Sequence, residues 1–374
     1  MKAAIMTLAL SDNYGAALQA CATARAVENS GHEATVYRYQ NWARVTHGMG
    51  VVSRLKFEAF LLAKAILTLN QRKKRFDAFR EAHIPLTKKA YGNNNELRAD
   101  PGDFDVYISG SDQIWNPKLF IFEYSYFLDF VPEGKKKISY ASSFGKAGFE
   151  EAYKEKCGKL LEKYAHISVR EKSGEAIVSE LCGKTATTCL DPTLLLTKDQ
   201  WTPMMASASE KAKNFKGILC YFMPGDQLVT DAIESFAQQL HKKTGLPIMR
   251  LGIKEHKVFS YPSGETDIQA GPADFLAYFA GAQYVVTNSF HGTAFSVNFG
   301  KECYIPINDT LPKEKALHER VTSLLTQVGA TERMLPASNP VLPQALTTDW
   351  QQVAARLDAL RQASLAYLKN ALED

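Results

Sequence analysis

The sequence predicts an α/β protein with two Rossmann-like domains, whose parallel sheets face a central cleft. Short apolar runs alternate with helical stretches, which is typical of parallel sheets covered on both faces. A proline-bearing break around 191–203 separates two such series. At roughly 150 residues per domain, 374 residues suffice for two. We place an N-terminal domain at 1–200, a C-terminal domain at 201–340, and a last helical segment at 341–374 that packs back across the domains.

The first series opens with a βαβ unit. Lys2–Ala9 is an apolar run typical of a buried strand, and a polar break precedes an Ala-rich helix that extends to about Asn29. Gly31 follows as a helix terminator, and Ala34–Tyr39 is the next strand. No GxGxxG motif lies in this unit, so the fingerprint of a dinucleotide site is absent.

The later elements repeat the alternation in both series. The predicted strands are Phe104–Ser109, Lys137–Ala141, His166–Arg170, Gly217–Phe222, Pro247–Leu251, Tyr284–Thr287 and Glu302–Ile305. The predicted helices are Glu150–Tyr164, Asp226–Thr244, Pro272–Ala280 and the amphipathic Trp350–Leu372.

Composition excludes several classes of protein. Hydrophobic residues make up 45% and charged residues 22%, as in ordinary soluble domains. A net charge of +4 is too small to indicate nucleic-acid binding. The six cysteines form no CxxC pair, so we expect no metal site and no cofactor, and reduced core thiols. The start lacks the features of a signal peptide and no run of about 18 apolar residues exists, so we expect a cytoplasmic protein.

Polar clusters follow several of the predicted strands. Ligands of open parallel sheets bind beyond the carboxyl ends of the strands, so these clusters favour one shared cleft. The clusters are Asn13-Tyr14-Gly15, Ser109-Gly110-Ser111-Asp112, Ser142-Ser143-Phe144-Gly145, Arg170-Glu171-Lys172 and the run from Asn288 to Thr293.

Each cluster also has a plainer interpretation. Asn13-Tyr14-Gly15 is either turn chemistry at a helix start or an anion or sugar site. Asp112 either caps the next segment or serves a ligand. Arg170 ends an apolar strand, where a guanidinium either reaches for solvent or meets an anion, and we favour the anion. His291 is either a core histidine or a reactive one, and Asp191-Pro192 is either a turn before the break or catalytic.

The segment 53–80 is rich in Lys and Arg, with large apolar residues interleaved. Such a segment forms either a solvated helix packed on its own domain or a basic amphipathic helix that rests on an anionic membrane surface.

Taken together, the motifs resemble the polysaccharide pyruvyl transferase family. The matching stretches are DNYGAALQA (12–20), SGSDQIWNP (109–117), YASSFG (140–145), SVREKSG (168–174), DPTLLL (191–196) with Trp201, and TNSFHGTAFS (287–296). They extend from the first strand to about residue 300, and their order and spacing are specific although each motif alone is weak.

The resemblance implies a two-domain fold similar to the B-type glycosyltransferases. It also implies transfer of the pyruvyl group of phosphoenolpyruvate to two hydroxyls of one sugar, which gives a cyclic ketal and phosphate. The acceptor is typically a cell-surface polysaccharide precursor, often on a lipid diphosphate carrier, and the basic segment 53–80 would suit such an acceptor at the cytoplasmic face of a membrane. The N-terminal domain is then the acceptor side and the C-terminal domain the donor side.

The chemistry assigns roles to the matching residues. Phosphoenolpyruvate is a compact anion that needs cations and helix N-termini, and protonation of its enol carbon needs a group that titrates near neutral pH. We expect His291 as general acid/base and Asp112 as the group that accepts a proton from, or orients, the acceptor hydroxyls. The expected donor-binding residues are Arg170, Asn288, Ser289, Thr293, Arg320 and Lys172. The expected acceptor-binding residues are Asn13, Tyr14, Ser111, Trp115, Asn116 and Ser143, with Tyr14 and Trp115 stacking on a sugar ring.

One position departs from the family pattern. Some members carry Arg-Leu-His-Gly, whereas this chain has Ser289-Phe290-His291-Gly292, so another cation must compensate and the donor itself comes into question. Two alternatives therefore remain open: a glycosyltransferase with a nucleotide-sugar donor, and a non-catalytic sugar-binding protein of a polysaccharide assembly complex.

Overall fold

The computed structural model describes residues 1–40, 70–119, 122–145, 148–223, 225–251, 264–311, 319–344 and 348–374. The chain divides into two compact units. Unit 1 comprises Met1–Leu195 and Arg361–Asp374, and unit 2 comprises Leu196–Leu360.

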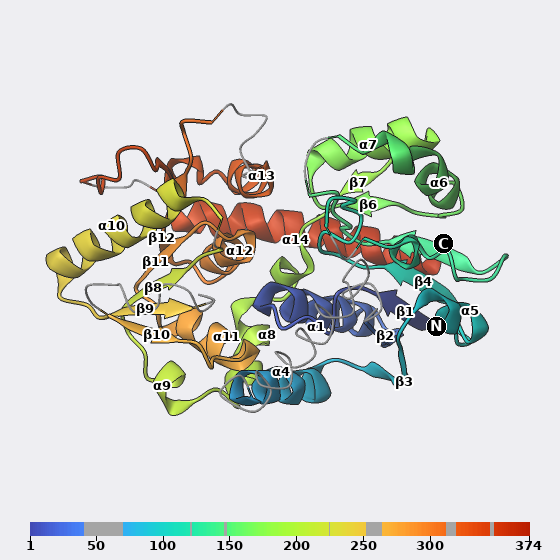
Figure 1. Ribbon diagram of the computed structural model, residues 1–374, viewed down its shortest axis with the longest axis horizontal. Coiled ribbons are helices and arrows are strands. Elements are labelled where there is room, and N and C mark those ends of the chain that lie inside the picture. The colour runs from blue at the N-terminus through green and yellow to red at the C-terminus, as the bar shows by residue number, and fades with distance from the viewer. Residues whose placement is uncertain are drawn as a thin grey trace, which may run out of the picture. The chain divides into compact units, whose positions relative to one another are not determined.

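Unit 1 is built on a parallel sheet (Figure 1). Its strands are β1 (Lys2–Met6), β2 (Glu33–Tyr39), β3 (Leu86–Tyr91), β4 (Val106–Ser109) and β5 (Lys136–Ser139), in the order β3-β2-β1-β4-β5. Single bridges from Ile138 to His166 and from Ser142 to Val169 continue this sheet toward the pair β6 (Ser168–Val169) and β7 (Thr187–Thr188). All of these pairings are parallel, so the carboxyl ends of the strands share one edge.

The helical elements of unit 1 connect these strands. They are α1 (Tyr14–Asn29), α4 (Asn70–His83), α5 (Asn94–Ala99), η1 (Tyr124–Phe127), α6 (Glu151–Leu161), α7 (Lys172–Cys182) and η2 (Pro192–Leu194). Asn13 caps α1, because its Oδ1 accepts the Ala16 N–H over 3.2 Å. Gly31 follows α1 at φ +85°, a conformation that favours glycine.

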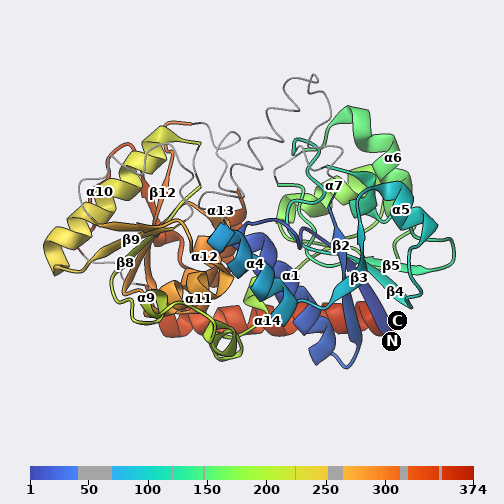
Figure 2. The same cartoon turned by 60° about the horizontal axis from the view of Figure 1, so that its bottom comes forward.

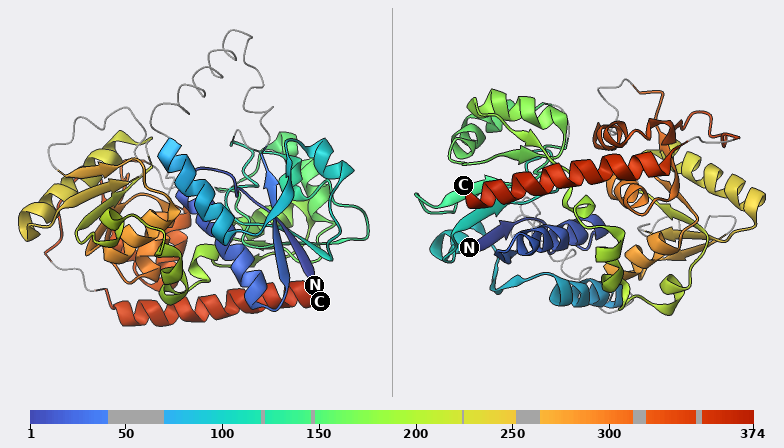
Figure 3. Two further views of the ribbon diagram at one scale, coloured as in Figure 1. Left: turned by 90° about the horizontal axis from the view of Figure 1, so that it is seen from below. Right: turned by 180° about the vertical axis from the view of Figure 1, so that it is seen from behind.

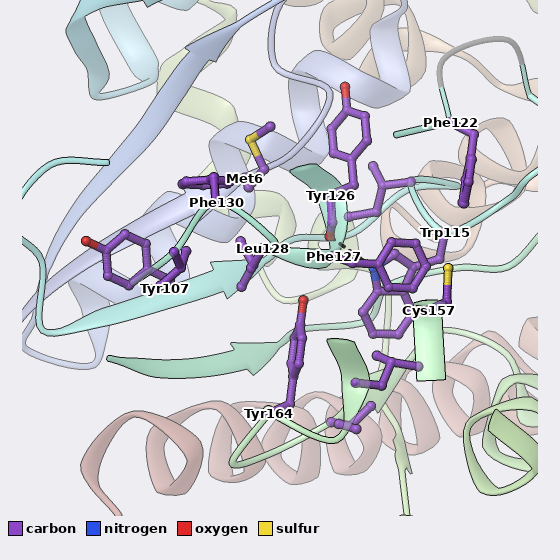
Figure 4. Packing of buried hydrophobic residues seen from close by; sticks show 14 of the residues in the cluster. Met6, Tyr107, Trp115, Phe122, Tyr126, Phe127, Leu128, Phe130, Cys157 and Tyr164 are labelled. Atoms are coloured by element: carbon purple, nitrogen blue, oxygen red, sulfur yellow. Dashed lines mark hydrogen bonds between the residues drawn. The ribbon is translucent and has the colours of Figure 1, made fainter. Parts of the chain in front are cut away.

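The core of unit 1 is dominated by aromatic side chains (Figure 4). Trp115 stacks on Phe127 with 5.2 Å between the ring centroids, and it meets the edge of Tyr164 at 6.1 Å. The indole Nε1 of Trp115 donates to the carbonyl of Tyr126 over 3.1 Å, so its polar atom is satisfied inside the core. This packing fixes the loop that follows β4.

Unit 2 has a second parallel sheet, in the order β10-β9-β8-β11-β12-β13. Its strands are β8 (Ile218–Tyr221), β9 (Ile248–Leu251), β10 (Glu265–Asp267), β11 (Tyr284–Thr287), β12 (Glu302–Ile307) and β13 (Met334–Pro336). Its helices are α8 (Lys198–Trp201), η3 (Thr202–Met205), α9 (Glu210–Lys213), α10 (Gln227–Thr244), α11 (Pro272–Gly281), α12 (Phe290–Asn298), α13 (Glu319–Val328) and η5 (Thr331–Arg333). In Figure 2, α10 covers one face of this sheet, and α11 and α12 lie on the other.

The last helix, α14 (Trp350–Glu373), is continuous (Figure 3). Its residues up to Leu360 belong to unit 2, and those from Arg361 onward belong to unit 1. In unit 1 the Arg361 Nε donates to the carbonyl of Leu194 over 2.7 Å, and the Ser364 hydroxyl accepts the Leu190 N–H over 3.0 Å. None of the described helices is both long and apolar enough to span a bilayer.

Both sheets share one strand order. Numbered within its own unit, each reads 3-2-1-4-5 from one edge, which is the order of doubly wound Rossmann-like sheets. The direction of winding reverses between β1 and β4 in unit 1 and between β8 and β11 in unit 2. These two places are topological switch points, where ligands of this fold bind beyond the strand ends. The predicted fold class, α/β with two Rossmann-like parallel sheets, is confirmed.

Several elements differ from the prediction. The strand predicted at Lys2–Ala9 ends at Met6, and β3, β10, β13, α7 and α13 are among the elements that were not predicted. The strand β3 is polar and half exposed, and β10 has only three residues, so neither carries an apolar pattern. The unit boundary lies at Leu195, beside the predicted boundary at 200.

Candidate active site

The unit 1 switch point is formed by the loops after β1 and β4. Thr7 follows β1, and its hydroxyl donates to the carbonyl of Ser111 over 3.0 Å. Gln19 of α1 in turn donates to the Thr7 hydroxyl over 2.8 Å. Neither Thr7 nor Gln19 was among the predicted site residues. Both are polar residues in otherwise apolar stretches, and such residues are a usable signal.

Asp112 stands at this point in an unusual backbone conformation. Its φ is +75°, which few residues other than Gly, Asn and Asp adopt. Its Oδ1 accepts the Gln113 N–H over 2.8 Å, and its backbone carbonyl accepts the Ser143 N–H over 3.0 Å. Left-handed conformations of non-glycine residues cost about 1–3 kcal/mol and concentrate at functional sites. Asp112 therefore lies on a strained but well-held loop, and its role in proton transfer stays a prediction.

Arg170 meets anions, as expected, but they are carboxylates of its own unit. Its Nη1 lies 2.7 Å from Oδ2 of Asp191, Nη2 lies 3.8 Å from Oδ1 of Asp112, and Nε lies 3.9 Å from Oε2 of Glu171. Burial opposes its charge, but the attraction of Asp191, Asp112 and Glu171 outweighs burial and raises the pKa of Arg170.

This arrangement corrects the donor-binding role expected of Arg170. Only 2% of its side chain is exposed, and the three carboxylates already outnumber its single positive charge. A phosphate group placed here would add negative charge to a buried site that is already net negative. We therefore call Asp112, Arg170, Glu171 and Asp191 the carboxylate cluster, and assign Arg170 to its internal structure.

Glu171 binds the loop after β5. Its Oε1 accepts the Ser143 hydroxyl over 2.8 Å and the backbone N–H groups of Phe144 and Gly145 over 2.8 and 3.1 Å. The hydroxyl of Ser143, expected to bind the acceptor, thus holds Glu171 instead. Glu171 was not predicted as a site residue, because nothing in the local sequence shows which way its side chain turns.

Asp191 is part of the same cluster and is fully buried. Its Oδ1 accepts the N–H and the hydroxyl of Thr193 over 3.0 and 2.7 Å, so it caps η2 as the turn interpretation of Asp191-Pro192 expected. Its Oδ2 accepts from Arg170 and, over 3.4 Å, from the hydroxyl of Ser111. Ser111, expected to bind the acceptor, is itself buried.

The remaining acceptor residues lie within the framework of unit 1. Trp115 is 0% exposed, so the expectation that its ring stacks on a sugar is wrong. Tyr14 is 1% exposed and its ring packs on Phe76 and under the guanidinium of Arg72, which corrects its expected stacking role in the same way. Asn116 donates to Oε1 of Gln113 over 2.9 Å, beside the loop that carries Asp112.

The second switch point, in unit 2, carries the histidine motif. Asn288 follows β11, and its side chain accepts the Met223 N–H over 2.8 Å and donates to the Met223 carbonyl over 3.0 Å. This pair of bonds ties the loop after β11 to the loop after β8. Ser289 caps α12, since its hydroxyl accepts the Gly292 N–H over 3.4 Å.

His291 lies in the first turn of α12, where the helix begins at the switch point. It is 8% exposed, and its ring contacts that of Phe290 at 5.3 Å between centroids. Gly292 allows this placement, because a Cβ there would lie 2.2 Å from Oγ1 of Thr287 on β11. Thr293 donates its hydroxyl to the Ser289 carbonyl over 3.1 Å, within the same turn.

Two further cations were expected near the donor. The guanidinium of Arg320, in α13, lies 5.8 Å from the ring centroid of Phe290, which is the neighbour of His291. Lys172 in unit 1 is 80% exposed and pairs with Glu175 in the first turn of α7. The structure thus places Arg320 beside the histidine motif, and it places Lys172 on the surface of unit 1.

The basic segment 53–80 is described only from residue 70 onward, so its part from 53 to 69 lies outside the described residues. In α4, Arg72 donates to the hydroxyl of Tyr14, Lys73 pairs with Asp77, and Arg80 pairs with Asp12 and Asp77. Within the described ranges, no group of His, Cys, Asp and Glu side chains is arranged to hold a metal ion.

Comparisons with known proteins agree with this architecture. A Listeria monocytogenes protein described as a UDP-N-acetylglucosamine 2-epimerase superposes with a TM-score of 0.50 at 10% identity, over 99% of this chain and 90% of that one. MnaA of S. aureus, solved with UDP, gives a TM-score of 0.50 at 10% identity over 99% and 91% of the two chains. At this identity the likeness shows the fold alone. The likeness agrees with the predicted pair of Rossmann-like parallel sheets.

The family follows from the sequence itself. The profile of the polysaccharide pyruvyl transferase family matches residues 13–308, which include both switch points. The chain belongs to the polysaccharide pyruvyl transferase family, and the resemblance noted from its motifs is confirmed. No curated protein sequence gives a significant match.

Proposed function

We propose that this transferase moves the pyruvyl group of phosphoenolpyruvate onto two hydroxyls of one sugar in a polysaccharide precursor. The observation that carries the proposal is that Asp112 and His291, the two groups suited to proton transfer, each lie at the switch point of a Rossmann-like sheet. The chemistry needs both groups.

The proton balance of the reaction defines their tasks. Each of the two sugar hydroxyls loses a proton as its oxygen bonds to the central carbon of the enol. One proton ends on the methylene carbon, which becomes the ketal methyl group, and the other leaves with the phosphate. His291 delivers the proton to carbon, and Asp112 accepts the proton of an attacking hydroxyl.

Charge favours the acceptor in unit 1. The carboxylate cluster is net negative, and of its members Asp112 is the most exposed, at 14% of its side chain. Neutral hydroxyls are suitable partners for such a carboxylate, whereas a phosphate is repelled by it.

The donor is then bound in unit 2. The first turn of α12 offers backbone N–H groups, and Arg320 beside Phe290 supplies a positive charge near His291. Arg320 is our candidate for the cation that Ser289 does not provide. Asn288, Ser289 and Thr293 shape this turn and the loop before it.

Calorimetric titration of phosphoenolpyruvate into the wild-type protein tests the donor. We expect saturable binding that Arg320→Ala weakens by about tenfold to a hundredfold, while Lys172→Ala, a matched loss of an exposed cation, leaves it unchanged. Phosphate release with added diol sugars, including lipid diphosphate-linked ones, then tests turnover. Binding of a nucleotide sugar in place of phosphoenolpyruvate would contradict the proposal and favour a glycosyltransferase.

Two further expectations belong to the same proposal. The first is that the segment 53–80 contacts a membrane, and the second is that the activity does not depend on metal ions. Sedimentation with anionic vesicles at low and high salt tests the first, and salt-sensitive binding is the expected result. Activity that survives EDTA is the expected result for the second, and activity restored only by a divalent ion would contradict it.

A further inference from the structure

The carboxylate cluster is graded in exposure. The side chains of Asp191 and Glu171 are 0% exposed and that of Arg170 is 2% exposed, whereas Asp112 reaches 14%. A buried charged network of this kind costs free energy to desolvate, so its members need a role that offsets the cost. The one member that reaches solvent, Asp112, is the one placed for chemistry.

Arg170 is held away from Asp112 by Asp191. The Nη1–Oδ2 distance to Asp191 is that of a strong charged hydrogen bond, 2.7 Å, whereas the Nη2–Oδ1 distance to Asp112 is 3.8 Å, beyond hydrogen-bond length. Arg170 therefore stabilises the negative charge of Asp112 without occupying its oxygen at hydrogen-bond distance.

Asp191 is itself fixed from the other side. Its Oδ1 is bound by Thr193 through two hydrogen bonds, and its Oδ2 faces Arg170 and Ser111. The backbone at residue 112 is fixed as well, at φ +75° by the bond from Ser143. Both ends of the relay from Asp191 through Arg170 to Asp112 are therefore anchored independently.

We propose that Asp191 and Arg170 are positioning residues for Asp112, an inference that rests on the proposed function. Asp191 retains the guanidinium at a distance at which it stabilises the carboxylate of Asp112. Its Oδ1, which also accepts the Gln113 N–H, then stays within reach of a sugar hydroxyl. Without the charge of Asp191, the guanidinium closes on Asp112 and occupies the oxygen that must accept the proton.

The variant Asp191→Asn tests this relay. Asparagine keeps an oxygen for Thr193 and presents a neutral amide to Arg170. We expect kcat to fall by about tenfold to a hundredfold, as for other misplacements of about 1 Å, with KM for phosphoenolpyruvate unchanged. The matched control, Asp129→Asn, neutralises another buried carboxylate of unit 1, which pairs with Arg98 over 2.6 Å outside the carboxylate cluster, so its kcat remains near that of the wild type. An equal loss in both variants would overturn the proposal.

A double-mutant cycle separates positioning from general damage. In the Asp112→Asn background, Asp191→Asn should cause no further loss of kcat, because its target is already removed. If the fold-losses of kcat in the two single variants multiply in the double variant, Asp191 acts independently of Asp112. If Asp191→Asn does not fold, Arg170→Lys replaces it in the same cycle, since a lysine retains the charge but cannot bridge two carboxylates.

A crystal structure of Asp191→Asn gives a readout that does not depend on turnover. The distance from Nη2 of Arg170 to Oδ1 of Asp112 should shorten from 3.8 Å to about 3 Å. An unchanged distance would contradict the positioning role even in an active enzyme. Absence of turnover in the wild type, with the shortened distance in the variant, would instead contradict the proposed function alone.

Discussion

Nη1 of Arg170 and Oδ2 of Asp191 form a 2.7 Å ion pair in which neither side chain has more than 2% of its surface exposed. Removing one partner of such a pair leaves a buried charge without compensation. The pair therefore links the stability of unit 1 to the geometry of its switch point.

We expect Arg170→Met to lower the free energy of unfolding by about 3–5 kcal/mol, because the three carboxylates of the cluster lose the guanidinium that faces them. Urea denaturation followed by circular dichroism measures this loss. Lys172→Met is the control, because Lys172 lies two residues further along the chain and is exposed. It should change the free energy of unfolding by no more than about 0.5 kcal/mol. A stable Arg170→Met protein with only a raised KM for phosphoenolpyruvate would restore the donor-binding role.

We expect His291→Ala to lower turnover by at least about 10²–10⁴-fold while the fold remains intact, because the general acid is lost. The rate of phosphate release measures turnover, and circular dichroism measures the fold. His241, in α10, bonds the Leu246 carbonyl over 2.7 Å and lies far along the chain from the motif, so His241→Ala serves as the control. Near-normal turnover of His291→Ala would refute the assignment.

We expect Trp115→Ala to cost about 3–5 kcal/mol of stability, because it leaves a cavity among Phe127, Phe144 and Tyr164. Trp115→Phe keeps most of the aromatic volume and should leave KM for the acceptor unchanged. A raised acceptor KM in a stable Trp115→Phe protein would instead indicate that the indole contacts the sugar.

We expect Gly292→Ala to destabilise unit 2 by about 1–3 kcal/mol, because the new Cβ would overlap the hydroxyl of Thr287 at 2.2 Å. Thermal unfolding measures the change. Thr287→Ala removes that hydroxyl, so combining it with Gly292→Ala should recover part of the loss. If the stability losses of Gly292→Ala and Thr287→Ala simply add in the double variant, the close approach of α12 to β11 is not the cause of the Gly292→Ala loss.

We expect native protein at pH 8 to react with no more than one equivalent of a thiol reagent, and denatured protein to react at all six cysteines. Burial raises the pKa values of Cys21, Cys157, Cys189, Cys220 and Cys303 to about 12, and only Cys182 is partly exposed. Since the thiolate is the reactive form, these five thiols stay inert. Rapid reaction of several thiols in the native state would contradict the buried arrangement.

The histidine motif shows how far local sequence patterns extend. The run from Asn288 to Thr293 lies between an apolar strand and a helical stretch, so its place at a strand end was predictable, and the structure confirms it. That Arg320, from α13, approaches Phe290 was not deducible, because nothing local relates the two segments.

The partners of Arg170 show where local sequence patterns are insufficient. Its position at the end of an apolar strand correctly indicated that it meets an anion, but the sequence did not show which one. Glu171 is its neighbour in the sequence, but Asp112 and Asp191, from loops remote in the sequence, could be recognised as its partners only after the strand order was known. The sugar-stacking role predicted for Trp115 was wrong for a related reason. An aromatic residue in a polar motif does not reveal whether its ring faces solvent or the core.

By itself the sequence determined the alternation of strands and helices, the fold class, the family and the strand ends at which the polar residues cluster. These properties depend on local periodicity and on short motifs that one segment carries alone. Only the tertiary structure decided which loops are neighbours, and so which charges neutralise each other and which rings are buried. Coulomb attraction and desolvation depend on distances between segments remote in sequence, and those distances are set by the order β3-β2-β1-β4-β5 of the unit 1 sheet.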